Sequence, residues 1–138
     1  IVTSRYYAHI AAELEAGVAE GLEKVGATYE FLEVPGAFEI PGAIAMAAET
    51  GEFDGFAALG CVIRGETAHY DLICSEVARG LMDLSLSGVP VAFGVLTVEN
   101  EAQAKVRADR KGKNKGVEVV AAVLRMVGLS YRFTLGRE

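Results

Sequence analysis

The feature that most constrains the fold of this chain is an unbroken run, Phe-Ala-Ala-Leu-Gly-Cys-Val-Ile, at residues 56–63. Eight residues without a polar side chain are typical of a strand that is covered on both faces. Such strands occur in parallel sheets, whose crossover connections place helices on each side. We therefore expect residues 56–63 to form the centre of a parallel sheet.

Three further segments predict strands, and helical patterns lie between them. Residues 1–3 are typical of the end of a strand, residues 28–34 alternate into a short strand, and residues 89–96 form another. Apolar residues at helical spacing predict helices at residues 10–25, 43–49, 73 to about 88 and 100 to about 111, and residues 117–127 form the apolar stripe of a last helix. Strands that alternate with helices pair in parallel through right-handed crossovers. We predict one domain over residues 1–138, a three-layer α/β/α sandwich with a four-stranded parallel sheet in flavodoxin-like order, with one strand inserted beside the first.

Composition and charge exclude several classes of protein. The chain has 138 residues, 51% of them hydrophobic, which is enough for a core and excludes a disordered chain. Its net charge of −6 argues against general nucleic-acid binding. We expect neither a membrane span nor a signal peptide, and therefore a soluble, cytoplasmic protein. Cys61 and Cys74 have no partners at metal-ligand spacing, so we expect no metal site and two reduced cysteines.

Functional groups gather in the segments that follow the predicted strands. In an open parallel sheet, a ligand binds beyond the carboxyl ends of the strands. These ends are expected at residues 4–7, 35–41, 64–70 and 97–100. Thr67 is suited to cap the next helix, whose unpaired first amides can bind an anion. His69 is the only imidazole in these segments, and taken alone it suits a capping or packing role as well as a catalytic one.

A second unusual feature is a basic segment, residues 107–115. It holds five cations and one anion, a local charge of +4, so the remaining 8 cations and 18 anions give the rest of the chain −10. Such a segment can bind an anion such as phosphate. It can also be a solvated helix end whose cations complement the helix dipole, which is the commoner role of a charge run of this size.

Four motifs, in this order and at matching spacing, resemble the 6,7-dimethyl-8-ribityllumazine synthase family over nearly the whole chain. They are VPGAFEIP at residues 34–41, LGCVIRGETAHYD at 59–71, FGVLT at 93–97 and NKG at 114–116. The resemblance implies condensation of 5-amino-6-(D-ribitylamino)uracil with 3,4-dihydroxy-2-butanone 4-phosphate to 6,7-dimethyl-8-ribityllumazine, the penultimate step of riboflavin biosynthesis, without metal or cofactor. It also implies a flavodoxin-like subunit that forms pentamers, in some members assembled into a shell of sixty subunits, with active sites between adjacent subunits.

The resemblance also assigns roles to residues of one subunit. His69 matches the proposed proton carrier. Substrate contacts match the pyrimidine-stacking Tyr6, the ribityl-binding Ala37, Phe38 and Glu39, the ring-edge backbone of Val62 and Ile63, and the phosphate-loop residues Glu66 and Thr67. A carboxylate suits the ribityl position because it accepts hydrogen bonds from sugar hydroxyls.

The neighbouring subunit is implied to complete the site. Phe93 would form a wall, Arg107 would bind the phosphate, and Lys115 would contact the pyrimidine carbonyl. The chain departs from the family at Tyr6, where Phe or Trp is usual, and at Tyr7, where an Asn is common. It departs further at Val106, where the family often has an acidic residue, and at residues 109–113, where shell-forming members carry Gly-Thr-Lys-Ala-Gly. These departures leave two alternatives open, a flavin- or lumazine-binding paralogue and a structural shell protein with little turnover, and they favour a free pentamer over a shell.

Overall fold

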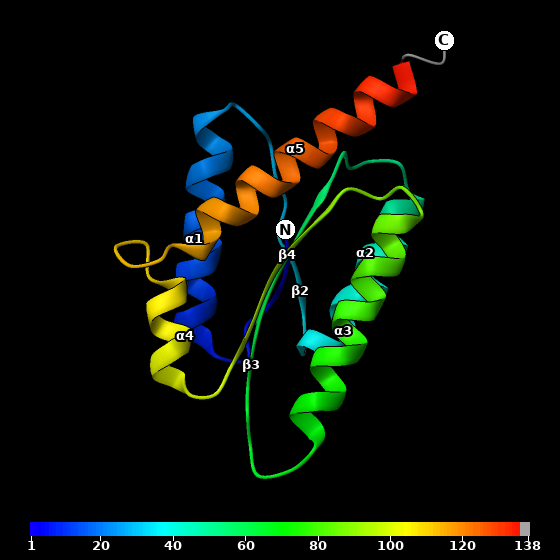
Figure 1. Ribbon diagram of the computed structural model, residues 1–138. Coiled ribbons are helices and arrows are strands. Elements are labelled where there is room, and N and C mark those ends of the chain that lie inside the picture. Colours follow the sequence, from blue (N-terminus) through cyan, green and yellow to red (C-terminus); the bar gives the residue numbers. More distant parts are fainter. Residues whose placement is uncertain (136–138) are drawn as a thin grey trace.

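Two layers of helices enclose one parallel sheet in the computed structural model of the chain, which describes residues 1–135 (Figure 1). The strands are β1 (Val2–Ser4), β2 (Leu32–Val34), β3 (Phe56–Ile63) and β4 (Val91–Val98). The helices are α1 (Ala8–Lys24), α2 (Ile40–Glu49), α3 (His69–Leu86), α4 (Glu101–Ala108) and α5 (Lys115–Leu135), and a short 3₁₀ turn, η1 (Ala37–Glu39), leads into α2. Helices α1, α4 and α5 cover one face, and α2 and α3 cover the other. The predicted three-layer sandwich is confirmed.

The order of the strands is β2-β1-β3-β4, and every pairing is parallel. Strand β1 therefore lies between β2 and β3, as the flavodoxin-like order predicts. Strand β4 forms the edge of the sheet and pairs with β3 along its whole length, from Phe56↔Val91 to Ile63↔Val98. All four carboxyl ends point the same way, so the segments that follow the strands meet at one end of the molecule.

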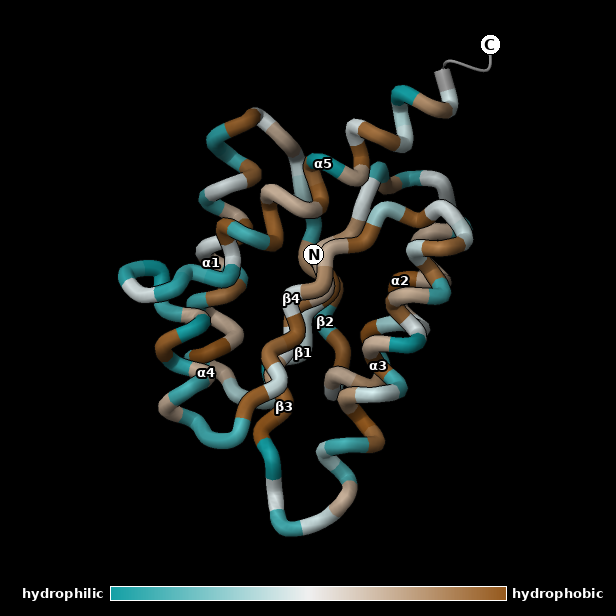
Figure 2. Tube along the Cα trace, in the orientation of Figure 1, coloured by the Kyte–Doolittle hydropathy of each residue, from teal (hydrophilic) through white to brown (hydrophobic). Residues whose placement is uncertain are grey.

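The core consists of two apolar layers that meet at β3. Ala57 and Leu59 face the α1, α4 and α5 side, whereas Phe56 and Ala58 face α2 and α3. All four side chains are buried, which confirms the expected double coverage of this strand. Full burial of a side chain such as Leu59 contributes about 1.5–3 kcal/mol relative to its exposure. In Figure 2 the hydrophobic colours concentrate accordingly along the central strands.

Two strands differ from their predicted bounds. Strand β2 begins at Leu32 rather than at residue 28, because β1 offers only three residues to pair with. Tyr29 and Phe31 instead lie at the surface and contact each other edge to face. Strand β4 begins at Val91, two residues later than predicted, because Pro90 has no N–H for a ladder and only its carbonyl accepts a bond, from the Phe56 N–H at 2.9 Å.

All five predicted helices are present, but α3 begins at His69, four residues before its predicted start, and α5 continues to Leu135, eight residues beyond the predicted stripe. Helix α2 starts three residues early, because η1 runs directly into it. Both cysteines are free, as expected. Over residues 1–135, none of the helices combines the length and apolarity that a bilayer crossing requires. Within the same range, no cluster of three or more His, Cys, Asp or Glu side chains is arranged to hold a metal ion.

Candidate functional site

A hollow of about 350 Å³ opens at the carboxyl ends of β1 and β3, and we call it the β1–β3 hollow. Its lining comes from the end of β1, the turn η1, the end of β3 and the start of α3. The lining residues are Ser4, Tyr6, Tyr7, Gly36, Ala37, Phe38, Glu39, Cys61, Val62, Ile63, His69 and Ile73. Seven of the residues singled out from the sequence therefore lie around one space, at the end of the sheet where a ligand was expected.

Two exposed aromatic rings stand at this hollow. Tyr6 is 76% exposed, and its ring meets the edge of the Tyr7 ring with centroids 5.1 Å apart and planes at 74°. Phe38 on η1 is 57% exposed. Tyr7 packs on the core beneath α1, so it holds Tyr6 from one side only. The free surface of the Tyr6 ring is thus available to stack on a flat heterocycle.

His69 reaches the hollow because α3 begins at this residue. The loop that joins β3 to α3, residues 64–68, is exposed throughout. Within it, the Thr67 hydroxyl accepts a hydrogen bond from the backbone N–H of His69, the first residue of α3, at 3.3 Å. The N-cap of α3 is Ala68, so the prediction that Thr67 caps this helix is wrong. Glu66 and Thr67 themselves line neither this hollow nor the second one described below.

The Arg64 side chain at the start of this loop forms ion pairs with Glu99 and with Asp71. Its Nε donates to Glu99 Oε2 at 2.8 Å, beyond the end of β4, and its Nη1 lies 3.4 Å from Asp71 in the first turn of α3. The guanidinium also lies over the Tyr70 ring, 4.3 Å from its centroid. One side chain therefore connects β3, the β4–α4 connection and the start of the helix that carries His69.

Cys61 contributes a thiol to the wall of the β1–β3 hollow. Burial, with a smaller contribution from the charge of Glu101, raises the pKa of this thiol to about 11. The thiolate is the reactive form of cysteine, and at neutral pH it is scarcely populated here. Cys61 is therefore an apolar wall residue rather than a nucleophile.

A second hollow, of about 290 Å³, lies beside the edge strand, and we call it the β4 hollow. It is lined by Phe93, Val95, Leu96, Thr97, Arg107, Lys113, Lys115 and Glu118. Phe93 remains 43% exposed because β4 has no neighbour on its outer side. Nη1 of Arg107 donates to the Gln103 carbonyl one turn earlier at 3.1 Å, and Lys115 Nζ lies 3.0 Å from Glu118.

Apart from Glu66 and Thr67, the predicted residues fall into two groups, one around each hollow. Phe93, Arg107 and Lys115 share the β4 hollow, and none of the residues lining it also lines the β1–β3 hollow. The lining residues to which sequence reasoning assigned no role include Tyr7, Ile73 and Lys113. Tyr7 adjoins the predicted Tyr6, and Ile73 lies one helical turn after His69, where an apolar side chain gives no distinct signal. Lys113 was hidden within a basic run.

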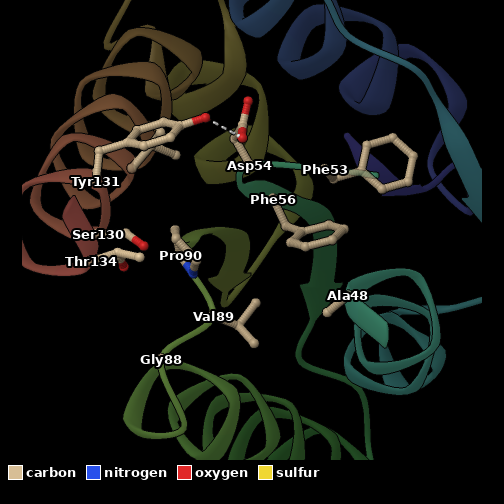
Figure 3. Close-up of a pocket in the computed structure, with 11 residues that line it drawn as sticks. Ala48, Phe53, Asp54, Phe56, Gly88, Val89, Pro90, Ser130, Tyr131 and Thr134 are labelled. Atoms are coloured by element: carbon tan, nitrogen blue, oxygen red, sulfur yellow. Dashed lines mark hydrogen bonds between the residues drawn. The ribbon is translucent and has the colours of Figure 1, made fainter. Parts of the chain in front are cut away.

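A third hollow, of about 310 Å³, lies at the opposite end of the sheet and holds none of the predicted residues. Figure 3 shows it between the last turns of α5, the segment before β3 and the segment before β4. Across it, the Tyr131 hydroxyl donates to Asp54 Oδ1, so the contact ties α5 to the amino end of β3. In parallel sheets this end serves stability, because ligands bind at the carboxyl end.

The fold and the two hollows define a class of protein. A doubly covered parallel sheet presents an imidazole, exposed rings and a carboxylate beyond its strands, with a cationic hollow at its edge strand. These are the features of an α/β protein with a small-molecule site at the carboxyl end of its sheet.

Comparison with known proteins narrows this class. The family described as 6,7-dimethyl-8-ribityllumazine synthase matches residues 1–130. Relatives of that name include those of Erythrobacter litoralis, 50% identical over 96% of this chain and 95% of the relative, and of Sphingopyxis alaskensis, 48% identical over 99% and 96%. That of Zymomonas mobilis is 48% identical over 97% and 96%. The chain belongs to the 6,7-dimethyl-8-ribityllumazine synthase family, which confirms the resemblance seen in the sequence.

Proposed function

We propose that this chain is a transferase that condenses 5-amino-6-(D-ribitylamino)uracil with 3,4-dihydroxy-2-butanone 4-phosphate to form 6,7-dimethyl-8-ribityllumazine, in riboflavin biosynthesis. The observation that carries this function is the family match over residues 1–130. Identities of 48–50% to relatives of that name, over nearly the whole chain, support it. The β1–β3 hollow supports it further, because its aromatic and carboxylate groups suit a pyrimidine that carries a polyhydroxy chain.

In this proposal the β1–β3 hollow binds the pyrimidine. Tyr6 stacks on the ring, and the backbone of Val62 and Ile63 bonds to the ring edge at the end of β3. The ribityl chain lies along η1, where Ala37 and Phe38 form the wall and Glu39 accepts hydrogen bonds from the hydroxyls. These six residues then fix the orientation of one substrate before the second arrives.

The β4 hollow binds the phosphorylated ketone, and we propose that it belongs to a neighbouring subunit. Phe93 closes the wall, Arg107 binds the phosphate and Lys115 reaches the pyrimidine carbonyl. The support is that the two hollows share no lining residue within one chain. The exposed loop residues Glu66 and Thr67 would face the phosphate across that interface. A pentamer satisfies this arrangement, because heterologous contacts can close into a ring.

The chemistry requires several proton transfers. The pyrimidine amine attacks the ketone, and water leaves to give an imine. Phosphate is then eliminated, and the second amine attacks the remaining carbonyl and expels a second water as the ring closes. His69 lines the hollow and takes and gives these protons. General acid–base catalysis of this kind typically raises the reaction rate about 10²–10⁴-fold. Holding the two substrates in the reactive orientation lowers the activation free energy by about 7–11 kcal/mol, so orientation contributes more to the rate than proton transfer does. Arg107 stabilises the phosphate as it leaves.

The experiment that tests the function mixes the purified protein with both substrates and follows formation of the fluorescent lumazine. We expect turnover that requires both substrates and releases inorganic phosphate in equal amount. Tight binding of lumazine or flavin without turnover would instead identify a binding paralogue. Assembly without affinity for either substrate would identify a structural shell protein.

Two further expectations stay predictions. We propose that the protein works in the cytoplasm. We also propose that residues 1–138 act as one domain, since the two apolar layers share the central strand β3.

A further inference from the structure

The β4 hollow holds more positive charge than the resemblance accounts for. Three cations line it, Arg107, Lys113 and Lys115, against one carboxylate, Glu118. The balance of three positive charges and one negative is +2. A phosphate monoester carries about −1.5 to −2 at neutral pH, so the charge of the hollow matches that of one such group.

The three cations are not equally available to a ligand. Lys115 Nζ lies 3.0 Å from Glu118, which offsets its charge. Arg107 donates one N–H to the Gln103 carbonyl at 3.1 Å, and its other N–H groups remain available to a ligand. Over residues 1–135, Lys113 lies within ion-pair distance of no carboxylate. Lys113 is therefore the cation of this hollow whose charge is least compensated.

The loop that carries Lys113 is held in place by its own backbone. The Asp109 carbonyl accepts from the N–H groups of Gly112 and Asn114 at 2.9 and 3.0 Å, and the Lys113 N–H donates to the Val106 carbonyl at 3.1 Å. The Asp109 carboxylate accepts from the Lys111 N–H at 2.8 Å. These bonds fix the backbone of the loop, so the point from which the exposed Lys113 side chain extends is set before a ligand binds.

The neighbouring residues fix the direction of the loop as well. Asn114 adopts φ 46°, a left-handed conformation that Asn tolerates better than most residues, and its side-chain oxygen is buried against Gly17 of α1. Arg110 binds Glu13 of α1 at 3.0 Å and also Glu20. With Asn114 pointing inward, Lys113 and Lys115 flank it and both line the hollow.

We propose that Lys113 is a second phosphate ligand for the phosphorylated ketone, acting beside Arg107. This inference rests on the proposed function. It assigns a binding role to a side chain that lies within the segment where this sequence departs from shell-forming members. Arg107 presents a planar fork of donors, whereas Lys113 contributes a compact charge that follows the phosphate as it leaves.

The test compares two lysines of the same loop. Lys113→Gln and Lys111→Gln remove the same charge, but Lys111 does not line the hollow. We expect Lys113→Gln to raise the KM for the phosphorylated ketone about 3- to 30-fold and to weaken inhibition by inorganic phosphate by a similar factor. The KM for the pyrimidine should stay unchanged, and Lys113→Arg should keep most of the affinity. Lys111→Gln should leave both constants near those of the unaltered protein.

Two results would overturn the inference. If Lys113→Gln and Lys111→Gln raised the KM for the ketone equally, the positive charge of the loop as a whole, rather than a direct contact from Lys113, would act on the ketone. If neither variant changed this KM, Lys113 would not be a phosphate ligand. Failure of the proposed function is distinguishable, because it appears as absent turnover in the unaltered protein. In that case, calorimetric titration with inorganic phosphate still decides the role of Lys113, since the unaltered protein should bind phosphate more tightly than Lys113→Gln.

Discussion

His69 and His9 make a matched pair of histidines, because both side chains are exposed but only His69 lines a hollow. We predict that His69→Ala lowers turnover about 10- to 10³-fold with both substrates saturating, since proton transfer is one contribution beside positioning. His9→Ala removes an exposed contact to Glu101 and should leave turnover unchanged. Lumazine fluorescence measures both rates.

A control on assembly accompanies this prediction. Native mass spectrometry should give the same mass for His69→Ala as for the unaltered protein, because His69 is exposed at the start of α3. Unchanged turnover in His69→Ala would remove it as proton carrier. Loss of the folded state would show instead that His69 is a structural residue.

Substitution of Arg107 should affect the binding of only one of the two substrates. We predict that Arg107→Ala raises the KM for the phosphorylated ketone by about 10-fold or more while the KM for the pyrimidine stays the same, because only a charge-assisted phosphate contact is lost. Arg125, exposed on α5 and outside both hollows, is the control for loss of an arginine. A fall in pyrimidine affinity alone would mean that the basic segment has been assigned to the wrong substrate.

The candidate site could be predicted from the sequence where residues lie in the segments that follow the strands. Tyr6, Glu39 and His69 lie two, five and six residues beyond the ends of β1, β2 and β3, and parallel pairing brings these segments to one end of the sheet. Lys113 could not be predicted in this way, because a lysine in a basic run has the same sequence pattern whether it faces solvent or a hollow. The separation into two hollows also depends on β4 being an edge strand. The order of the strands is a property of the whole sheet, so a local sequence pattern does not reveal it.

Helices α1 and α5 pack closely where Gly17 and Gly116 meet. A Cβ added at Gly116 would lie 2.9 Å from the backbone carbon and Cα of Gly17 and 3.0 Å from the Val18 nitrogen. Backbone atoms cannot give way as a flexible side chain can. We predict that Gly116→Ala lowers the free energy of unfolding by about 1–3 kcal/mol, measured by urea denaturation.

Gly128 supplies the control within the same helix. A Cβ there meets nothing within 4 Å, so Gly128→Ala should raise the free energy of unfolding by about 0.4–1 kcal/mol through the lower entropy of the unfolded chain. If both variants were destabilised equally, a general effect on α5 rather than the contact with Gly17 would explain the loss.

The elements themselves could be predicted to different extents. Strand β3 was predicted with its observed bounds, because burial on both faces leaves an unbroken apolar pattern. Strand β2 was predicted four residues too long, because alternation in residues 28–31 resembles a strand although β1 is too short to pair with it. Strand length thus depends on the partner strand, which a local pattern does not contain.

At the scale of the whole molecule, several surfaces are unusually apolar for a chain that works alone. Leu72, Met82 and Leu86 on α3 are 59%, 56% and 79% exposed, and Phe93 on the edge strand is 43% exposed. Exposed apolar side chains that gather on one helix mark an interaction surface. They support the proposed association of subunits through the α3 side and the β4 edge.

The last prediction tests whether one active site uses two subunits. If His69 and Arg107 act from different chains, subunits of His69→Ala and Arg107→Ala can complement each other. A site that takes its β1–β3 hollow from an Arg107→Ala subunit and its β4 hollow from a His69→Ala subunit has both side chains intact. When the two variants are mixed randomly in equal amounts, each of the two hollows of a site has a probability of about one half of being unaltered. About a quarter of all sites therefore contain both an unaltered β1–β3 hollow and an unaltered β4 hollow.

The experiment dissociates and reassembles the two variants together, then assays them at a low concentration of phosphorylated ketone, where each variant alone is impaired. We expect about a quarter of the unaltered activity, in particles of about 73 kDa, five times the mass of the 14.6 kDa chain. The double variant His69→Ala/Arg107→Ala, treated in the same way with either single variant, should give no gain. Activity that stays at the mean of the two variants would contradict the shared site, because subunits that each hold a whole site cannot repair one another. A mass near sixty subunits would contradict only the free pentamer, since a shell built from pentamers contains the same interface.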